Sequence, residues 1–323
     1  MFEQFQNFIT DNRSDVESAL RERLPLSSLP SARRLNDALE YALFPGGKRL
    51  RPVLSLLASS LVDLPRAESL TVACAMEFLH GSSLVVDDLP GMDDACLRRN
   101  KLALHLAFGE GVAMLAALAL LNQSYALFAE AARLRGRDGA VERLIQEAST
   151  AIGAEGMIGG QLLDLQPADK SSDTDCLAGR ELKTVALTRL MMTAGAIAHG
   201  ADDADTAALA EFGESFGRAY QICDDIMDCA SDSYFTGKTS RQDARHGRLN
   251  AVDVLGQDFA HHEAYEAVQR GVSALVKRFG HRWETDLLAD AAYYTISRAP
   301  KEIKTKSIPP GTLATPETAG VID

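Results

Sequence analysis

Apolar residues recur at helical spacing through nearly the whole chain. Leu, Ala, Met and Ile return every three or four positions, alternating apolar and polar runs are scarce, and short polar or Gly/Pro segments separate the blocks. The pattern therefore predicts an all-α protein. The expected helices cover residues 3–22, 32–44, a segment that carries Lys48, Arg49 and Arg51, then 67–86, 102–133 as one helix or a helix pair, 141–165 with an interruption at Gly156, Gly159 and Gly160, 183–198 and 206–229, followed by two or three weaker helices that reach about Arg298.

Short polar segments separate these blocks, and none of them has the Gly/Ser composition of a domain linker. They lie at Pro25–Ser31, Pro45–Gly47, Arg133–Gly139, Gln166–Cys176 and Ser231–Leu249. Because no short repeat is present either, we expect one domain over residues 1–298. Residues 299–323 are rich in Pro, Gly and Thr and have no periodicity, which predicts a disordered tail.

Composition narrows the class of protein. The chain has 323 residues, 46% of them hydrophobic, and a formal net charge of −12, which argues against broad nucleic-acid binding. Its five cysteines form no CxxC pair and no zinc-like spacing, which is typical of reduced thiols. We find no signal peptide and no uninterrupted apolar run of the length that a membrane span needs. We therefore expect a soluble, cytoplasmic protein.

Two aspartate clusters stand inside apolar, helix-patterned stretches. They are DDLPGMDD at Asp87–Asp94 and DDIMD at Asp224–Asp228. At an effective dielectric constant of about 20, two like charges about 4 Å apart repel each other by roughly 4 kcal/mol. Hard divalent cations with oxygen ligands would offset this repulsion. If the two clusters face one another across a helical cavity, they can hold several Mg²⁺ ions and bind a diphosphate.

The spacing of the second cluster places three polar side chains on one helical face. Gln221, Asp224 and Asp228 share that face, and Asp225 lies beside it. A solvated acidic face is the alternative interpretation. Four apolar neighbours argue against it: Ile222, Cys223, Ile226 and Met227.

The first cluster is interrupted by Pro90 and Gly91, which break a regular helix. We expect the chain to bulge there and to bring the later pair, Asp93 and Asp94, back towards the first pair. An acidic loop at a helix end is the alternative. The apolar residues before the cluster and the Arg98–Arg99 pair after it favour a site for metal and phosphate.

A third element is GGKRLRP at Gly46–Pro52. Two glycines let the backbone approach a ligand closely, and Lys48 and Arg51 are spaced one helical turn apart. Arginine binds phosphate oxygens in a bidentate manner, while lysine supplies a compact charge. A metal-held diphosphate together with a separate, metal-free basic pocket predicts two diphosphate substrates.

The order of these motifs resembles the trans-isoprenyl diphosphate synthase family over about residues 35–298. The run is GGKRLRP, His80, DDLPGMDD with LRRN, GMIGGQLLDL, LKT, FGRAYQICDDIMD and GK…D. It is most similar to bacterial geranylgeranyl diphosphate synthases of carotenoid pathways, and farnesyl diphosphate synthases are the nearest alternative. The resemblance implies a dimeric, isoprenoid-synthase-type bundle around a deep central cavity.

The resemblance also implies the roles of individual residues. Three Mg²⁺ ions, for which Mn²⁺ can substitute, would bridge Asp87, Asp88 and Asp93 on one wall and Asp224 and Asp228 on the other. The allylic diphosphate would be held by the metals and by Arg98, Lys183, Thr184, Gln221, Lys238 and Arg248. The metal-free isopentenyl diphosphate would lie on Gly47, Lys48, Arg51, His80 and Arg99. The catalytic set implied is Asp87, Asp88, Asp224, Arg98, Lys183 and Lys238.

The implied chemistry needs no side-chain nucleophile. Metal ions and cationic side chains stabilise the departing diphosphate, and the allylic C–O bond ionises. The double bond of isopentenyl diphosphate attacks the resulting cation, and a proton is then lost, in the family view to the departing diphosphate.

Some positions depart from the family pattern. Arg180 stands where a His is common, Asn100 replaces a Gly, and Asp243 is followed by ARHGRLN, in which Arg248 stands for a Lys. These departures leave the efficiency and substrate choice of the allylic side open.

Product length is expected to depend on Ser82 and Ser83, one helical turn before Asp87, where farnesyl-forming relatives tend to carry an aromatic residue. Two serines predict a C20 product, and Ser82→Phe is expected to shorten it to C15. Met114 and Leu118 are the alternative residues that would narrow the cavity.

Two other classes of protein are the alternatives. A class I terpene cyclase needs no isopentenyl pocket and has a mixed second metal motif, whereas this chain has GGKRLRP and a full DDIMD. A non-catalytic subunit of a heteromeric synthase usually lacks the aspartate motifs, and both are present here.

Overall fold

The computed structural model describes residues 2–134, 139–165, 173–230 and 250–300, and helices account for most of them. The helices are α1 (Glu3–Arg23), a short 3-10 helix η1 (Pro30–Ala32), α2 (Arg33–Leu43), α3 (Leu50–Leu61), α4 (Arg66–Asp87), α5 (Leu104–Phe108), α6 (Glu110–Leu134), α7 (Ala140–Ile152), α8 (Met157–Asp164), α9 (Asp173–His199), α10 (Asp203–Ala230), α12 (Ala251–Leu255), α13 (Gln257–Phe279) and α14 (Trp283–Ser297). The predicted all-α fold is confirmed.

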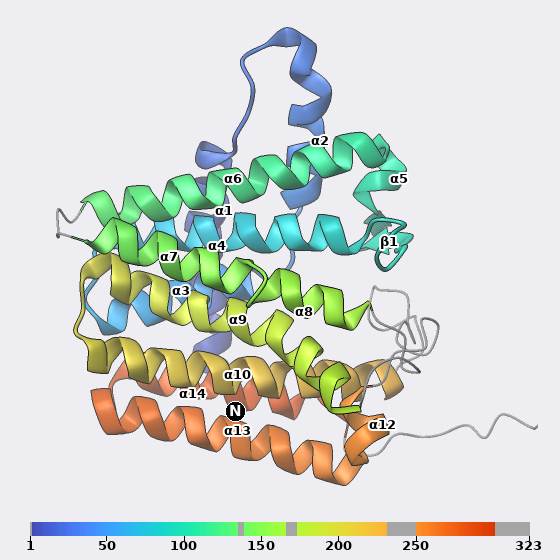
Figure 1. Ribbon diagram of the computed structural model, residues 1–323. Helices are drawn as coiled ribbons and strands as arrows, with labels where there is room; N and C mark the ends of the chain where they lie inside the picture. Colours follow the sequence, from blue (N-terminus) through green and yellow to red (C-terminus); the bar gives the residue numbers. More distant parts are fainter. Residues whose placement is uncertain (1, 135–138, 166–172, 231–249, 301–323) are drawn as a thin grey trace, which may run out of the picture.

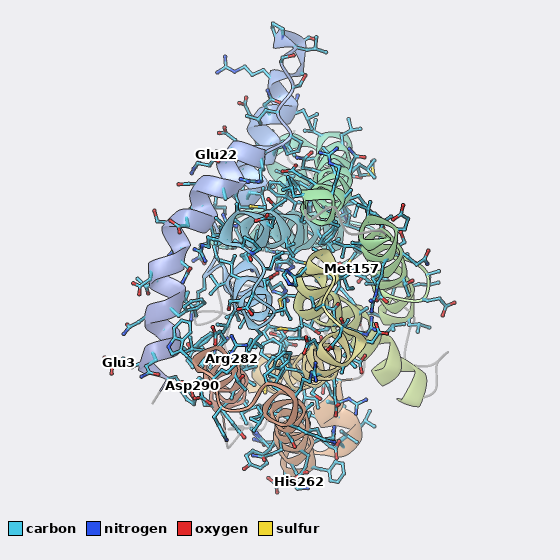
Figure 2. The ribbon with its side chains drawn as sticks, turned by 90° about the vertical axis from the view of Figure 1, so that its left-hand side faces the viewer. Glu3, Glu22, Met157, His262, Arg282 and Asp290 are labelled. Atoms are coloured by element: carbon cyan, nitrogen blue, oxygen red, sulfur yellow. The ribbon has the colours of Figure 1, made fainter. Side chains whose placement is uncertain are left out.

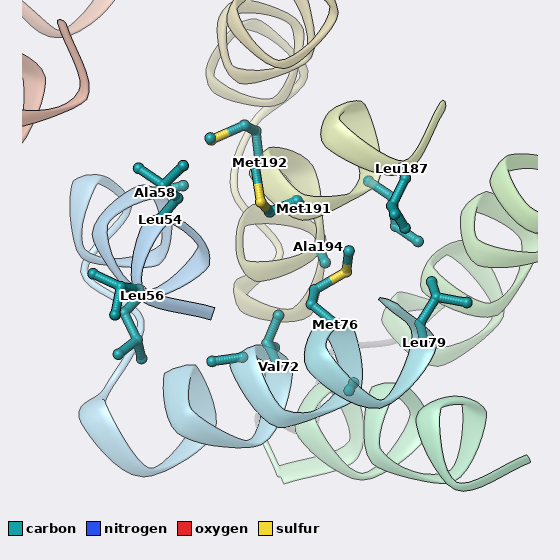
Figure 3. Close-up of a cluster of buried hydrophobic side chains, with 14 of the residues drawn as sticks. Leu54, Leu56, Ala58, Val72, Met76, Leu79, Leu187, Met191, Met192 and Ala194 are labelled. Atoms are coloured by element: carbon teal, nitrogen blue, oxygen red, sulfur yellow. The ribbon is translucent and has the colours of Figure 1, made fainter. Parts of the chain in front are cut away.

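The long helices stack side by side in a bundle (Figure 1). Helix α4 packs against α6 and α3, while α10 packs against α9 and α13, and α9 also reaches α3. Helix α1 runs along one side of the bundle, from Glu3 to Glu22 (Figure 2). The buried apolar side chains form one continuous cluster, and at its centre α3, α4 and α9 meet through residues such as Leu54, Met76 and Met191 (Figure 3).

Small residues allow α9 to approach its neighbours closely. A Cβ atom on Gly195 of α9 would overlap Ser59 of α3, and a Cβ atom on Gly217 of α10 would overlap Thr188 of α9. These close crossings fix α9 between α3 and α10, because a side chain at either glycine would push the helices apart. The N-terminal half of α9, which carries Lys183 and Thr184, is thereby held near the end of α10.

Two predicted boundaries were wrong. The stretch 102–133, expected as one helix or a helix pair, is the pair α5 and α6, separated at Gly109 with φ 84°. Helix α9 begins at Asp173, so the expected polar loop is shorter than predicted. Lys48 precedes α3, which begins at Leu50 after Arg49 with φ 53°, so Lys48 and Arg51 do not share a helical turn.

A two-residue hairpin was not predicted. Strand β1 (Leu97–Arg98) pairs antiparallel with β2 (Lys101–Leu102), and Arg99 and Asn100 form the turn with φ 53° and 61°. Positive φ at both central positions is the type I′ geometry that suits a twisted hairpin, and asparagine tolerates it well. Asn100 can therefore take the place of the family's glycine without changing the turn.

Two helices, α4 and α6, meet the length and hydropathy that a membrane span requires, which corrects the expectation that no such run is present. Of the most apolar window, 78% is buried in α4 but only 39% in α6. Helix α4 is therefore a core helix. Helix α6 presents an apolar face outside the bundle.

Candidate active site

The first aspartate cluster folds back on itself as predicted from Pro90 and Gly91. Helix α4 ends at Asp87, and the backbone N–H of Asp93 then donates to the Asp87 carbonyl at 2.9 Å, while Ala95 N–H donates to the Asp88 carbonyl at 3.3 Å. Asp93 thus returns to Asp87. Asp94 is exposed, with φ 46°, and its backbone N–H donates to the Leu89 carbonyl at 3.1 Å.

Each of the first two carboxylates is paired with a cation from another element. Arg98 Nε lies 3.0 and 3.1 Å from the two carboxylate oxygens of Asp88, which is buried. Burial lowers the pKa of Arg98, but the hydrogen bond and charge of Asp88 outweigh it, so the net shift is upward. Lys183 Nζ lies 3.1 Å from Asp87 Oδ1.

Asp87 remains short of positive charge despite this pair. Burial is the largest cause and raises the pKa of Asp87; the charge of Lys183 opposes this rise, the charge of Asp93 adds to it, and the net shift is upward. The ionised carboxylate would therefore gain from a further cation, which is what a divalent metal supplies.

The second cluster is ordered by a chain of hydrogen bonds. Thr184 Oγ1 donates to Gln221 Oε1 at 2.6 Å, and Gln221 Nε2 donates to Asp225 Oδ1 at 2.9 Å. Asp225 Oδ2 accepts from the backbone N–H of Ala251 at 2.9 Å, at the start of α12. Buried Asp225 thus joins α10 to α12, whereas Asp224 and Asp228 stay half-buried.

One turn of α9 joins the two clusters. Lys183 contacts Asp87 of α4, and the next residue, Thr184, contacts Gln221 of α10, one helical turn before Asp224. Both α4 and α10 end at the right-hand end of the bundle in Figure 1. The aspartate clusters therefore flank α9 at the same end of the molecule and do not lie on separate outer surfaces.

Helix α8 adds two residues that were not among the predicted site residues. Asp164 Oδ2 lies 3.9 Å from Lys183 Nζ, and Gln161 Nε2 lies 3.6 Å from the sulfur of Met92. The buried Gln161 Oε1 has no hydrogen-bond partner in the part of the chain that the structure describes. Both residues belong to GMIGGQLLDL, so this motif was the feature of the sequence from which their place in the site could have been predicted.

The carboxylates fit Mg²⁺ shared with a substrate. No group of three or more His, Cys, Asp or Glu side chains among the described residues could hold a metal alone. Mg²⁺ is usually held by one or two carboxylates, with waters and substrate phosphates completing its shell. Two all-oxygen donor sets on either side of α9 match that requirement.

The basic pocket brings together four of its five predicted residues. Arg51 Nη1 lies 3.1 Å from His80 Nε2, and a Cβ atom on Gly47 would lie 3.6 Å from Arg99 Nε. The buried Arg51 Nε has no hydrogen-bond partner among the described residues, so the guanidinium keeps a donor for a ligand. The fifth residue, Lys48, is exposed.

The candidate product-length residues differ in position. Ser82 is 5% exposed, while Ser83 is half-buried and donates to the His80 carbonyl at 2.9 Å. Met114 and Leu118 are 49% and 60% exposed on the outer face of α6. They are therefore wrong candidates for narrowing a cavity inside a single copy of the chain.

Other predictions remain untested. Lys238 and Arg248 lie outside the described residues, as do the side chain of Arg180 and the predicted tail beyond residue 300. Cavities of about 390 and 430 Å³ are present, but neither is lined by either aspartate motif. The deep central cavity and the single domain over 1–298 stay predictions.

Comparison with known proteins agrees with this geometry. The polyprenyl synthetase family model matches residues 32–275. A geranylgeranyl diphosphate synthase of Pantoea ananas is 36% identical over 248 residues, covering 75% of this chain and 78% of its own. An FPP/GFPP synthase from Zymomonas mobilis, solved without ligand, has a TM-score of 0.78 and 29% identity and covers 92% of this chain and 100% of its own.

A geranyltransferase from Helicobacter pylori, solved with magnesium and isoprenyl diphosphate, has a TM-score of 0.72 and 28% identity, covering 92% of this chain and 98% of its own. The fold is thus that of the all-α isoprenoid synthases. The chain belongs to the polyprenyl synthetase family.

Asp225→Ala is expected to lower the free energy of unfolding by about 1–3 kcal/mol, because it leaves Gln221 and the Ala251 N–H without their acceptor. Asp224→Ala is the matched control: it should change metal-free stability by no more than about 0.5 kcal/mol. Urea denaturation in a chelator measures both. Equal losses in the two variants would contradict a structural role specific to Asp225.

Proposed function

We propose that the chain is a Mg²⁺-dependent prenyltransferase that condenses isopentenyl diphosphate with an allylic diphosphate to give geranylgeranyl diphosphate. The observation that carries the proposal is the turn of α9 on which Lys183 reaches Asp87 and Thr184 reaches Gln221. It brings the acidic residues of both motifs to one place together with a cation. Membership of the polyprenyl synthetase family and the name of the Pantoea relative support the same reaction.

The allylic diphosphate would bind between the two acidic walls. Mg²⁺ held by Asp87, Asp88 and Asp93 on one side and by Asp224 and Asp228 on the other would supply Lewis-acid stabilisation of the departing diphosphate. Lys183 and Arg98 already lie at this place, and each would exchange its aspartate for a phosphate oxygen. Their charge would then be available where negative charge develops during ionisation. Thr184 and Gln221 orient each other beside this position.

Isopentenyl diphosphate would bind without metal on the neighbouring basic pocket. Arg51 offers its unpaired Nε, His80 and Arg99 lie beside it, and Gly47 leaves its backbone open to a phosphate. Lys48 is exposed and precedes α3, and it would supply a further cation to the ligand. The two diphosphates therefore occupy adjacent sites of different chemistry, which places an electron-rich double bond next to the ionising allylic carbon.

The proposal is tested by incubating purified protein with isopentenyl diphosphate, Mg²⁺ and, separately, dimethylallyl, geranyl or farnesyl diphosphate. Mass spectrometry of the products should show a C20 diphosphate as the longest major species. A chelator should abolish turnover, and added Mg²⁺ should restore it. A C15 end product would favour farnesyl diphosphate synthesis, and a cyclic hydrocarbon would indicate a terpene cyclase.

Ser83 replaces Ser82, the residue chosen from the sequence, as the one to which product length is expected to respond more. In a helix, Ser83 lies about 40° round the axis from Asp87, whereas Ser82 lies about 140° away. Ser83→Phe should place a ring on the face that carries the substrate and shorten the product from C20 to C15. Ser82→Phe is the comparison variant, and an unchanged C20 product from both would exclude a gate at this level.

A second copy of the chain is the proposed occupant of the apolar face of α6. Met114, Leu115 and Leu118 are 49%, 58% and 60% exposed there, and the helix is among the most apolar of those described. A surface of aliphatic side chains without charge can pack against an identical surface in a two-fold dimer. The protein is therefore proposed to be a homodimer that forms through α6.

Leu115→Glu combined with Leu118→Glu is expected to convert the dimer to a monomer, because the partner would have to bury both charges. Phe259→Glu, at a residue 50% exposed on α13, is the control and should leave the dimer intact. Light scattering after size exclusion gives the mass of each. A dimeric double variant would refute the α6 interface.

A further inference from the structure

The buried carboxylate of Glu77 contacts two arginines that lie beside the glycines of GGKRLRP: Arg49 beside Gly46, and Arg99 beside Gly47. Glu77 of α4 is 2% exposed, and its Oε1 contacts both Arg49 Nη1 and, at 3.8 Å, Arg99 Nη2. Neither the proposed substrate set nor the aspartate motifs include Glu77. A carboxylate this deeply buried is stable only when it is paired.

Arg49 is a fixed part of the scaffold. Its side chain is fully buried, its Nε lies 2.7 Å from Glu17 Oε1, and its Nη2 donates to the Leu43 carbonyl at 2.7 Å. The guanidinium also fills the space beside Gly46, where a Cβ atom would overlap it. Gly46 therefore makes room for Arg49 and not, as the sequence suggested, for a ligand.

Arg99 depends on Glu77 far more than Arg49 does. Glu77 is the one carboxylate within ion-pair distance of Arg99 among the described residues, whereas Arg49 has Glu17 as well. Burial lowers the pKa of Arg99, and the charges of Arg49, Arg98 and Arg51 add to the fall, while Glu77 opposes it. Without that carboxylate, three neighbouring guanidinium groups would repel Arg99 from its place beside Gly47.

We propose that Glu77 is a positioning residue of the isopentenyl diphosphate pocket, whose carboxylate holds the Arg99 guanidinium against Gly47 and separates it from Arg49. This inference rests on the proposed function, because it assigns Arg99 to the metal-free diphosphate. Glu77 does not touch the substrate. It acts by fixing the direction in which Arg99 presents its donors.

The test measures KM for each substrate separately in Glu77→Gln. KM for isopentenyl diphosphate should rise about tenfold or more, because the one carboxylate charge paired with Arg99 is lost, while KM for the allylic diphosphate changes less than about twofold. Glu17→Gln is the matched control. It removes the other carboxylate of Arg49 but leaves the Glu77–Arg99 contact, so both KM values should stay within about twofold of the parent.

A double-mutant cycle with Arg99→Ala separates positioning from general stability. If Glu77 acts through Arg99, then Glu77→Gln should add little to KM for isopentenyl diphosphate once Arg99 is already removed. Additive effects would overturn the proposal, as would equal rises in KM for both substrates. A fall in KM for isopentenyl diphosphate would also overturn it, because Glu77 would then only repel the substrate.

Thermal unfolding of each variant shows whether it is folded at the assay temperature. If Glu77→Gln gives no folded protein, Glu77→Asp takes its place: it keeps the charge but shortens the side chain by one methylene, and the same selective rise in KM is expected. Failure of the parent protein to consume isopentenyl diphosphate with any allylic partner would refute the proposed function itself. If the parent protein is active but the Glu77 variants change KM for both substrates alike, only the role of Glu77 is refuted.

Discussion

Compensation of buried negative charge is the constraint on which the rest of the site depends. Asp87 and Asp88 end a core helix, and each is paired with a cation from another element: Asp87 with Lys183 of α9, and Asp88 with Arg98 of the hairpin. Carboxylates removed from water are costly unless they are paired and hydrogen-bonded. Helix α9 and the hairpin must therefore dock on α4 for the cluster to be stable, and the close helix crossings at Gly195 and Gly217 let α9 do so.

The same pairing explains how the proposed diphosphate site could exist before any ligand arrives. Cations intended for phosphate would repel one another, and carboxylates intended for metal would do the same. In this protein each set neutralises the other: Lys183 rests on Asp87, Arg98 on Asp88, and Arg99 on Glu77. In the proposed reaction, binding of metal and diphosphate would exchange partners among charges that are already in place, with little reorganisation of the protein.

Local pattern predicted most of this fold and located the two aspartate clusters, whereas the roles of Lys183, Thr184 and His80 were inferred from the family resemblance. The 3.6-residue period located the long helices, and Pro90 and Gly91 were enough to predict that Asp93 returns to Asp87. Contacts between distant segments were not predictable in this way. Nothing near Glu77 in the sequence indicates that Arg49 and Arg99 meet it, because those contacts are set by how α3 and the hairpin pack on α4.

The left-handed turn of the hairpin has a consequence for how the family can vary. Arg98 and Arg99 are neighbours in the chain, yet one faces the acidic wall and the other the glycine loop. The two-residue turn cannot absorb a change in length, because Lys101, just beyond it, donates a hydrogen bond from Nζ to the Phe44 carbonyl at 2.9 Å. An inserted or deleted residue in the turn would rotate the guanidinium of Arg98 or of Arg99 away from its present neighbours. The two proposed substrate pockets therefore share the spacing that this turn sets, and a change in the length of the turn would disturb both.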